Sequence, residues 1–211
     1  MPRASHNRTL ARREEIVDAC EQLYRTMSFK EITLKKIGEV TSFTRTSIYN
    51  YFRTREEIFL ALFEREYRLW GEDLEAILAR DRLSRAEFSQ ELGRSLAARP
   101  NLLKLLSMNM YDIEENSRVE SLTEFKLTYG RALSLVRACL ERFFGMDKEA
   151  SEGFLYAFFP FLYGVYPYAN ATPKQEEAMR RAGVAYLRLS AAELCSRAAL
   201  RLLEGSLPAE N

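Results

Sequence analysis

The sequence has little histidine, cysteine or glycine. It contains one histidine (His6), three cysteines and nine glycines in 211 residues. A single histidine in the N-terminal tail, which we expect to be disordered, excludes a histidine-based catalytic triad. The cysteines, Cys20, Cys139 and Cys195, are too few and too far apart for a disulfide framework or a metal-ligand cluster, and they suit a reducing compartment. We expect each to be a buried small apolar residue rather than a redox sensor.

Motifs of cofactor-dependent enzymes are also missing. Neither a P-loop nor the GxGxxG dinucleotide fingerprint occurs in the chain. We therefore expect a protein that is not an enzyme and that holds no cofactor or metal ion. A helical hydrolase built on a pair of carboxylates stays open as a remote alternative, although no spacing of acidic residues favours it.

No apolar run is long enough to cross a membrane. The most apolar stretch, residues 154–169, contains two prolines and four tyrosines, and it is shorter than the roughly 20 residues that a spanning helix needs. The basic N-terminus is not followed by the apolar segment of a signal peptide. We therefore expect a cytoplasmic protein in which residues 154–169 form a buried helix.

Charge is unevenly distributed along the chain, although the net charge is only +1. Residues 1–55 contain eleven Lys or Arg and six Asp or Glu, whereas residues 56–211 contain twenty and twenty-four. A basic head on an acidic body is the electrostatic pattern of a chain that binds a polyanion with one end.

Helix signals dominate, and no stretch shows the alternation typical of a β-strand. The pattern predicts an all-α protein of about nine helices. Several starts have capping boxes, such as Thr54 with Glu57 and Ser84 with Glu87. The expected helices cover residues 9–27, 33–40, 44–52, 54–79, 84–99, 100–111, 117–144, a segment beginning at 148, and 172–203.

The segment TRTSIYNYF (residues 44–52) has two different faces when it is drawn as a helix. At about 100° per residue, Ile48 and Phe52 lie on one side with other core-type residues, while polar residues point the opposite way. In the major groove of DNA, Arg pairs with guanine, Asn with adenine, and a Thr methyl group contacts thymine. We predict base contacts by Arg45, Thr46 and Asn50.

Other polar residues nearby suit phosphate contacts. Tyr49 is placed to give its hydroxyl to a phosphate, and Thr33, Thr44 and Arg55 stand at helix starts, where backbone N–H groups also favour anions. A surface helix without any DNA partner can show the same residue types. The short turn TSF between LKKIGEV and TRTSIYNYF favours the DNA interpretation, because it makes a helix-turn-helix with the second helix as reader. A basic arm precedes it, with Arg3, Arg8, Arg12 and Arg13.

Residues 16–61, and ITLKKIGEVTSFTRTSIYNYFRTREEIFLALFE in particular, resemble the N-terminal DNA-binding domain of the TetR family of transcriptional regulators. The resemblance implies a helix-turn-helix head, a divergent helical ligand-binding body, a two-fold homodimer, and repression of an operator until a small molecule releases the protein. It implies phosphate contacts from Thr33, Tyr49 and Arg55 and the same three base contacts. We therefore expect a DNA-binding domain over residues 1–55 and an effector-binding and dimerisation domain over residues 56–211.

Three positions depart from the family pattern. Ser28 and Ser42 stand where the family usually has turn glycines, and Gly38 replaces an alanine. A serine held at positive φ costs on the order of 1 kcal/mol. We therefore expect a head of somewhat lower stability with an unchanged fold.

The last expected helix has a row of small residues at steps of three and four. Small side chains let helices approach closely, so we predict that this row and the preceding aromatic helix form a four-helix interface across a two-fold axis. Two heads spaced by about 34 to 36 Å, or a multiple, would then read a near-palindromic operator. The alternative is a stripe that packs inside one subunit. The row consists of Ala178, Ala182, Ala185, Leu189, Ala192, Ser196, Ala199 and Leu203.

An effector pocket is expected among aromatic residues. Residues 154–168 include eight of them, with Pro160 interrupting the backbone hydrogen bonds and Gly164 leaving space. Plain core packing is the alternative for each, and a constitutive architectural DNA-binding protein with a solid body is the alternative for the whole chain. The predicted lining residues are Trp70, Met108, Tyr111, Phe125, Tyr129, Phe158, Phe161 and Tyr166.

Overall fold

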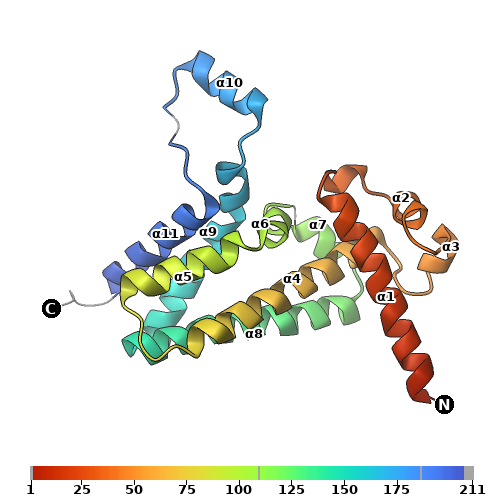
Figure 1. Ribbon diagram of the computed structural model, residues 1–211, viewed down its shortest axis with the longest axis horizontal. Helices are drawn as coiled ribbons and strands as arrows, with labels where there is room; N and C mark the ends of the chain where they lie inside the picture. Colours follow the sequence, from red (N-terminus) through yellow and green to blue (C-terminus); the bar gives the residue numbers. More distant parts are fainter. Residues whose placement is uncertain (1, 109, 186, 207–211) are drawn as a thin grey trace. The chain divides into compact units, whose positions relative to one another are not determined.

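The protein is all-helical in the part of the chain that the structure describes, which confirms the expected fold class. This computed structural model describes residues 2–108, 110–185 and 187–206, and the side chains of residues 2–7 and 45 lie outside the description. Within these described residues, a short 3-10 helix, η1 (Phe29–Glu31), accompanies eleven α-helices (Figure 1). These are α1 (Pro2–Tyr24), α2 (Leu34–Glu39), α3 (Arg45–Ile48), α4 (Arg55–Leu78), α5 (Arg85–Ala97), α6 (Pro100–Leu106), α7 (Met110–Glu115), α8 (Val119–Phe144), α9 (Lys148–Ala169), α10 (Pro173–Ala182) and α11 (Ala191–Ser206).

The chain divides into two compact units. The first, called the head here, consists of Met1–Arg65 and Asn109–Thr128. The second, called the body, consists of Glu66–Met108 and Tyr129–Asn211. The head therefore includes residues 56–65 and 109–128, which lie beyond the boundary that we expected at residue 55. Helices α4 and α8 each contribute residues to both units.

Aromatic side chains from distant parts of the sequence form much of the head's core. The rings of Tyr24 and Phe59 meet edge to face with their centroids 5.3 Å apart, and Phe63 stacks on Phe125 at 5.1 Å. Tyr24, Phe59 and Phe63 are each at most 1% exposed. Such pairs add to the free energy gained by burying the rings, so the segment carrying Phe125 is packed into the head.

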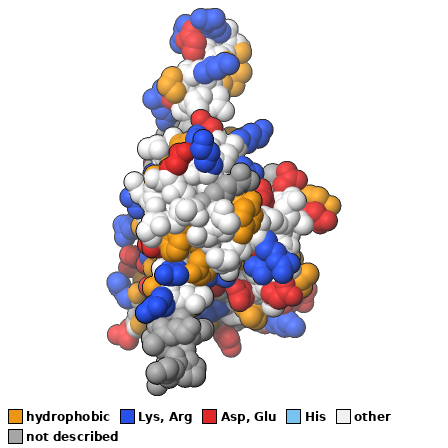
Figure 2. Space-filling model, turned by 90° about the vertical axis from the view of Figure 1, so that its right-hand side faces the viewer, with side chains coloured by type: hydrophobic (Ala, Val, Ile, Leu, Met, Phe, Trp, Pro, Cys, Tyr) orange, Lys and Arg blue, Asp and Glu red, His pale blue; other side chains and the backbone are white. Residues whose placement is uncertain are grey.

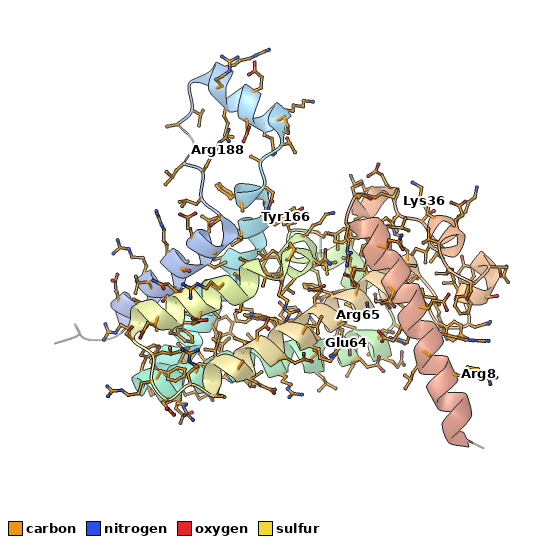
Figure 3. All side chains as sticks on the ribbon, viewed as in Figure 1. Arg8, Lys36, Glu64, Arg65, Tyr166 and Arg188 are labelled. Atoms are coloured by element: carbon orange, nitrogen blue, oxygen red, sulfur yellow. The ribbon has the colours of Figure 1, made fainter. Side chains whose placement is uncertain are left out.

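Two ion-pair sites hold the helices of the head together. Arg65 of α4 reaches α1, where its Nη1 lies 2.6 Å from Asp18 and 3.3 Å from Glu21, and its Nη2 pairs with Glu14 (Figure 3). The second site is Glu57, whose side chain is fully buried and pairs with Arg118. Ion pairs of this kind need good geometry to offset the cost of desolvation.

Glu57 has its carboxylate oxygens satisfied from several sides. Oε2 accepts from the backbone N–H of Arg53 at 2.8 Å and from Nη2 of Arg118 at 2.9 Å, and Oε1 accepts from both Nε and the backbone N–H of Arg118. Burial raises the pKa of Glu57, but these hydrogen bonds together lower it by more, so its pKa lies below the ordinary value.

Helices α5 and α11 cross closely in the body. A Cβ atom on Gly93 would lie only 2.1 Å from Ser196 Oγ and 2.6 Å from the Ala192 carbonyl oxygen. Ala199 and Leu203, further along α11, are fully buried. The small residues of α11 therefore allow two helices of one chain to come together.

The prediction of one helix over residues 172–203 is wrong, because two separate helices, α10 and α11, cover this range. Helix α10 ends at Gly183, which adopts the left-handed conformation (φ 67°), and α11 starts only at Ala191. Glycine favours this conformation because it has no Cβ. Helix α10 contains no buried residue, and Figure 1 shows it standing away from α9 and α11 of the same unit.

Two other boundaries differ from the expectation. Helix α1 begins at Pro2, so the tail around His6 is helical rather than disordered. Residues 100–115, expected as one helix and a loop, form the separate helices α6 and α7.

The three cysteines are buried, as expected. Burial raises the pKa of Cys139 and Cys195 to about 12, and it raises that of Cys20 well above its ordinary value. Thiols of this kind carry little reactive thiolate near neutral pH. In the described residues, no helix combines the length and apolar character that crossing a bilayer requires.

Candidate functional site

The helix-turn-helix is positioned by two capped helices and a buried apolar side. Thr33 caps α2 by accepting from the backbone N–H of Lys36 at 3.3 Å, and Thr44 caps α3 by accepting from that of Ser47 at 3.2 Å. Ile37 and Ile48, one on each helix, are fully buried. Such caps satisfy backbone donors that a helix start leaves unpaired, so both helix starts are locally fixed.

Helix α3 is shorter than the expected 44–52 but continues as a helical turn. It ends at Ile48, after which the N–H groups of Asn50, Tyr51 and Phe52 still donate to Ser47 and Ile48. Phe52 is 1% exposed. The turn therefore keeps the core-facing side that we expected for this segment.

The opposite side of α3 and its turn is exposed. Thr46 and Asn50 are exposed, and Tyr49 is 46% exposed. These side chains were predicted to contact bases or a phosphate, and the fold brings them to one surface. The backbone of Arg45 lies at the start of the same helix, while its side chain lies outside the described part of the chain.

Ser42 in the helix-turn-helix turn is held by a carboxylate from α1. Both its backbone N–H and its hydroxyl donate to Oε1 of Glu15, at 2.9 and 2.7 Å. These hydrogen bonds lower the pKa of Glu15. The expected strain at Ser28 and Ser42 is wrong, because no non-glycine residue among those described has positive φ. The hydroxyls instead make bonds that a glycine lacks; Ser28 donates to Glu31 at 2.7 Å.

Arg55 is engaged inside the head. Its Nη1 donates to the carbonyl oxygens of Phe29 and Ile32 at 3.2 and 3.1 Å, and its Nη2 pairs with Glu56 at 2.8 Å. The guanidinium also lies over the Phe29 ring, 4.1 Å from the centroid. These contacts fix η1 against α4, so Arg55 has a structural role that the sequence did not indicate.

Arginines of the basic arm have different surroundings. Arg13 lies over the ring of Phe52 at 4.7 Å, and Arg12 donates to the Tyr51 hydroxyl at 3.4 Å. Arg8, one turn earlier on α1, is exposed and labelled in Figure 3. Figure 2 shows Lys and Arg side chains interspersed with acidic ones on its visible face rather than covering it uniformly.

The body contains an apolar cavity of about 570 Å³ between α8 and α9. Its volume lies within the range usual for small-molecule sites. The structure places one cation and one carboxylate among mainly aromatic and aliphatic walls. The lining residues are Tyr129, Leu133 and Arg137 of α8 and Glu152, Leu155, Tyr156, Phe159, Pro160 and Tyr163 of α9.

The predicted pocket residues are dispersed, and of the eight only Tyr129 lines this cavity. Trp70 and Phe158 are fully buried in the body, where core packing was the alternative. Tyr111 and Phe125 belong to the head. Met108 is half-buried beyond the end of α6. Phe161 and Tyr166 belong to α9 but do not line the cavity, and Tyr166 is labelled in Figure 3.

The predicted dimer seam does not exist as one row. Ala199 is fully buried within a single chain, which fits the alternative of packing inside one subunit, and the backbone carbonyl oxygen of the half-buried Ala192 lies at the crossing with Gly93. The interface role of the row stays a prediction. Ala178, Ala182 and Ala185 are exposed on or just after α10, and Leu189 is half-buried before α11. The physical reason is the helix break at Gly183, which separates the two halves of the row.

A family model described as the C-terminal domain of tetracyclin repressor-like proteins matches residues 64–210. This match covers well over half of the chain and consists of the part that the helix-turn-helix resemblance does not include. The chain belongs to the TetR family of transcriptional regulators. No curated protein sequence is significantly similar to it.

Solved structures of the TetR family share the fold over nearly the whole chain. A Thermus thermophilus repressor of this family, FadR, solved in complex with lauroyl-CoA, has a TM-score of 0.59 at 20% identity, covering 95% of this chain and 97% of that one. A Mesorhizobium loti protein assigned to the same family has a TM-score of 0.57 at 16% identity, covering 94% and 96%. At these identities the likeness concerns the fold alone.

Sequence reasoning missed the cavity residues Arg137 and Glu152. One signal was present: Tyr129, Leu133 and Arg137 follow at steps of four, so they share one face of α8. An arginine on the same helix face as a tyrosine and a leucine was the available signal for a charged group in this cavity.

Proposed function

We propose that this chain is a ligand-responsive repressor that binds a near-palindromic operator as a homodimer. The observation that carries the proposal is the two-sided α3 segment. Ile48 and Phe52 anchor it in the head, while Thr46, Tyr49 and Asn50 are exposed together on the other side. A fixed helix with an exposed polar side is what direct readout in the major groove requires.

Residue roles within the interface follow from chemistry. Asn50, Thr46 and Arg45 are the proposed base readers, and Tyr49 donates its hydroxyl to a phosphate. The side-chain oxygens of Thr33 and Thr44 accept the capping hydrogen bonds. Their proposed phosphate contacts therefore use the hydroxyl proton as donor, or the neighbouring backbone N–H groups. We do not retain Arg55 as a phosphate contact, because its guanidinium bonds within the head.

A homodimer would place two such heads on two half-sites. Exposed aromatic side chains on α9 support an interface there: Phe161 and Tyr168 are 38% and 67% exposed, and their seven-residue spacing puts them on one side of the helix. A row of this kind is typical of helix pairs across a two-fold axis. Sedimentation at micromolar concentration tests this, and a monomer at every concentration would contradict it.

An effector would act through the equilibrium between DNA-bound and released states. Two helices, α4 and α8, supply residues to both units, so a change in the body has a continuous backbone route into the head. An effector that binds the released state more tightly lowers DNA affinity by the same coupling factor.

The experiment that tests the proposed function is selection of genomic fragments by the purified protein at near-physiological salt, followed by sequencing. Enrichment of one near-palindromic site is the expected outcome. Retention of DNA without sequence preference, lost as salt rises, would contradict the proposal and favour the architectural alternative.

Two substitutions separate the proposed roles within the interface. Asn50→Ala should weaken binding by about 1–3 kcal/mol and relax the preference at one base position, because a bidentate base contact is lost. Tyr49→Phe should weaken binding to all sequences alike, because a phosphate contact carries no base information. Fluorescence anisotropy with the selected site and its single-base variants measures both. Equal losses on every sequence for both variants would refute this division of roles.

A further inference from the structure

Arg137 in the body cavity has a hydrogen-bond donor that the described chain does not satisfy. Its Nε is buried and finds no acceptor among the described residues. Its Nη2 lies 3.9 Å from Oε1 of Glu152, which is too far for a hydrogen bond. A buried N–H without an acceptor is costly and uncommon in folded proteins. The Arg137 side chain as a whole is 37% exposed and lines the cavity, so a ligand there can reach other N–H groups of the guanidinium.

The guanidinium at the cavity wall indicates the chemistry of a ligand that would bind it. An arginine Nε and one of its Nη atoms form a planar fork that matches the two oxygens of a carboxylate. Glu152 is 39% exposed and does not occupy that fork. Glu152 pairs with Arg137 only at 3.9 Å, so an anionic ligand can form the direct charge-assisted hydrogen bonds that Glu152 does not make, and an anion is favoured over a cation.

The remaining walls indicate the body of the ligand. Tyr129 and Phe159 meet edge to face, with ring centroids 5.8 Å apart at 84°, and Leu133, Leu155 and Tyr156 add apolar surface. The Tyr129 and Phe159 rings can pack against a planar apolar group by stacked or edge-to-face contacts. The cavity's volume of about 570 Å³ leaves room for a ligand of one or two rings.

We propose that this cavity binds an organic carboxylate with an apolar, ring-containing body and that Arg137 binds the carboxylate. As an effector site it rests on the function proposed above, but the binding reaction itself does not involve DNA. The Arg137 guanidinium would donate to the carboxylate oxygens, while Tyr129 and Phe159 hold the ring.

The test compares acids with their neutral amides by isothermal titration calorimetry on the full-length protein. Suitable probes are benzoate, 2-naphthoate and 4-hydroxycinnamate, each with its primary amide. At least one acid should bind, and its amide should bind about tenfold more weakly or worse, because the charge-assisted bonds are lost. If none of the acids binds at millimolar concentration, or if acid and amide bind equally, the proposal is wrong.

Variants assign the effect to Arg137. Arg137→Gln should weaken acid binding about tenfold or more while leaving amide binding little changed, and Arg137→Lys should restore only part of it because the fork is missing. Arg131→Gln is the matched control, since Arg131 is an exposed arginine of the same helix that does not line the cavity. Circular dichroism checks that each variant is folded. Acid binding by Arg137→Gln equal to wild type would overturn the assignment.

Operator binding distinguishes this proposal from the function on which it rests. If the acids bind but no operator is selected, the ligand site stands and the repressor proposal fails. If an operator is selected but no acid binds, the regulator stands and the carboxylate site fails.

Discussion

Glu57→Ala is expected to lower the free energy of unfolding by about 3 kcal/mol, because it removes the buried partner of Arg118 and leaves unpaired donors behind. Glu57 is 1% exposed, and its two oxygens accept from Arg53 and Arg118. Urea denaturation followed by circular dichroism measures the loss. Glu57→Gln keeps the shape and one acceptor, so it should lie between wild type and the alanine variant.

The matched control for this result is Glu91→Ala. Glu91 also pairs with an arginine, Arg94 at 3.0 Å, but that arginine is 64% exposed. Pairs of this kind contribute little, so the change should stay within about 0.5 kcal/mol. If Glu57→Ala is no more damaging than Glu91→Ala, the ion pair with Arg118 does not stabilise the head.

The contribution of Glu57 should also depend on pH. Because its pKa is lower in the folded than in the unfolded protein, its stabilisation is present above the ordinary glutamate value of about 4.3 and is lost as pH falls through the folded pKa. Wild type should therefore exceed Glu57→Gln in stability at pH 7, and the two should converge at acid pH. A constant difference between pH 7 and pH 3 would contradict this linkage.

Glu57 also shows which contacts a local sequence pattern can predict and which it cannot. The spacing of Thr54 and Glu57 predicts a capping box, and the backbone N–H of Glu57 does donate to the Thr54 hydroxyl at 3.2 Å. The glutamate carboxylate, however, accepts from Arg53 and from Arg118, which is 61 positions away along the chain. Capping depends on residues close together in the sequence, so it can be predicted from the sequence. An ion-pair partner that only tertiary packing brings close cannot be predicted in this way.

The same distinction explains the two halves of the candidate site. The helix-turn-helix could be predicted because caps, turn and core-facing side lie within twenty residues, and Thr33, Thr44, Ile48 and Phe52 are found in those roles. The cavity depends on how α8 and α9 pack against each other, so aromatic content alone placed only Tyr129 correctly on its lining.

The break in the last expected helix has local signals in the sequence, although the periodic spacing of small residues predicts one continuous helix. Gly183 ends α10, and Ser190 caps the next helix by accepting from the N–H of Glu193 at 3.2 Å while its own N–H donates to the Glu193 carboxylate. A glycine followed by a capping box is a typical helix end and start. The regular spacing of alanines favours one continuous helix, but small residues at such steps also occur where helices of one subunit cross.

Gly93→Ala tests that crossing and is expected to lower the free energy of unfolding by about 3 kcal/mol. The added Cβ would meet Ser196 Oγ at 2.1 Å and the Ala192 carbonyl oxygen at 2.6 Å. Because the second contact is with backbone, α5 and α11 must move apart, and the fully buried Ala199 would lose packing with them. This loss should exceed the gain of up to about 1 kcal/mol that alanine brings to a helix interior.

Gly130→Ala is the same substitution in open space and should have the opposite sign. Gly130 lies within α8, and nothing stands within 4 Å of its added Cβ, so only the helix propensity changes and the protein should gain up to about 1 kcal/mol. Chemical denaturation of both variants, with sedimentation to follow the oligomeric state, separates two explanations of the small-residue row. A loss of stability without a change in self-association is expected for a seam inside one subunit. If Gly93→Ala were as stable as Gly130→Ala but altered self-association, the row would belong to the interface between subunits after all.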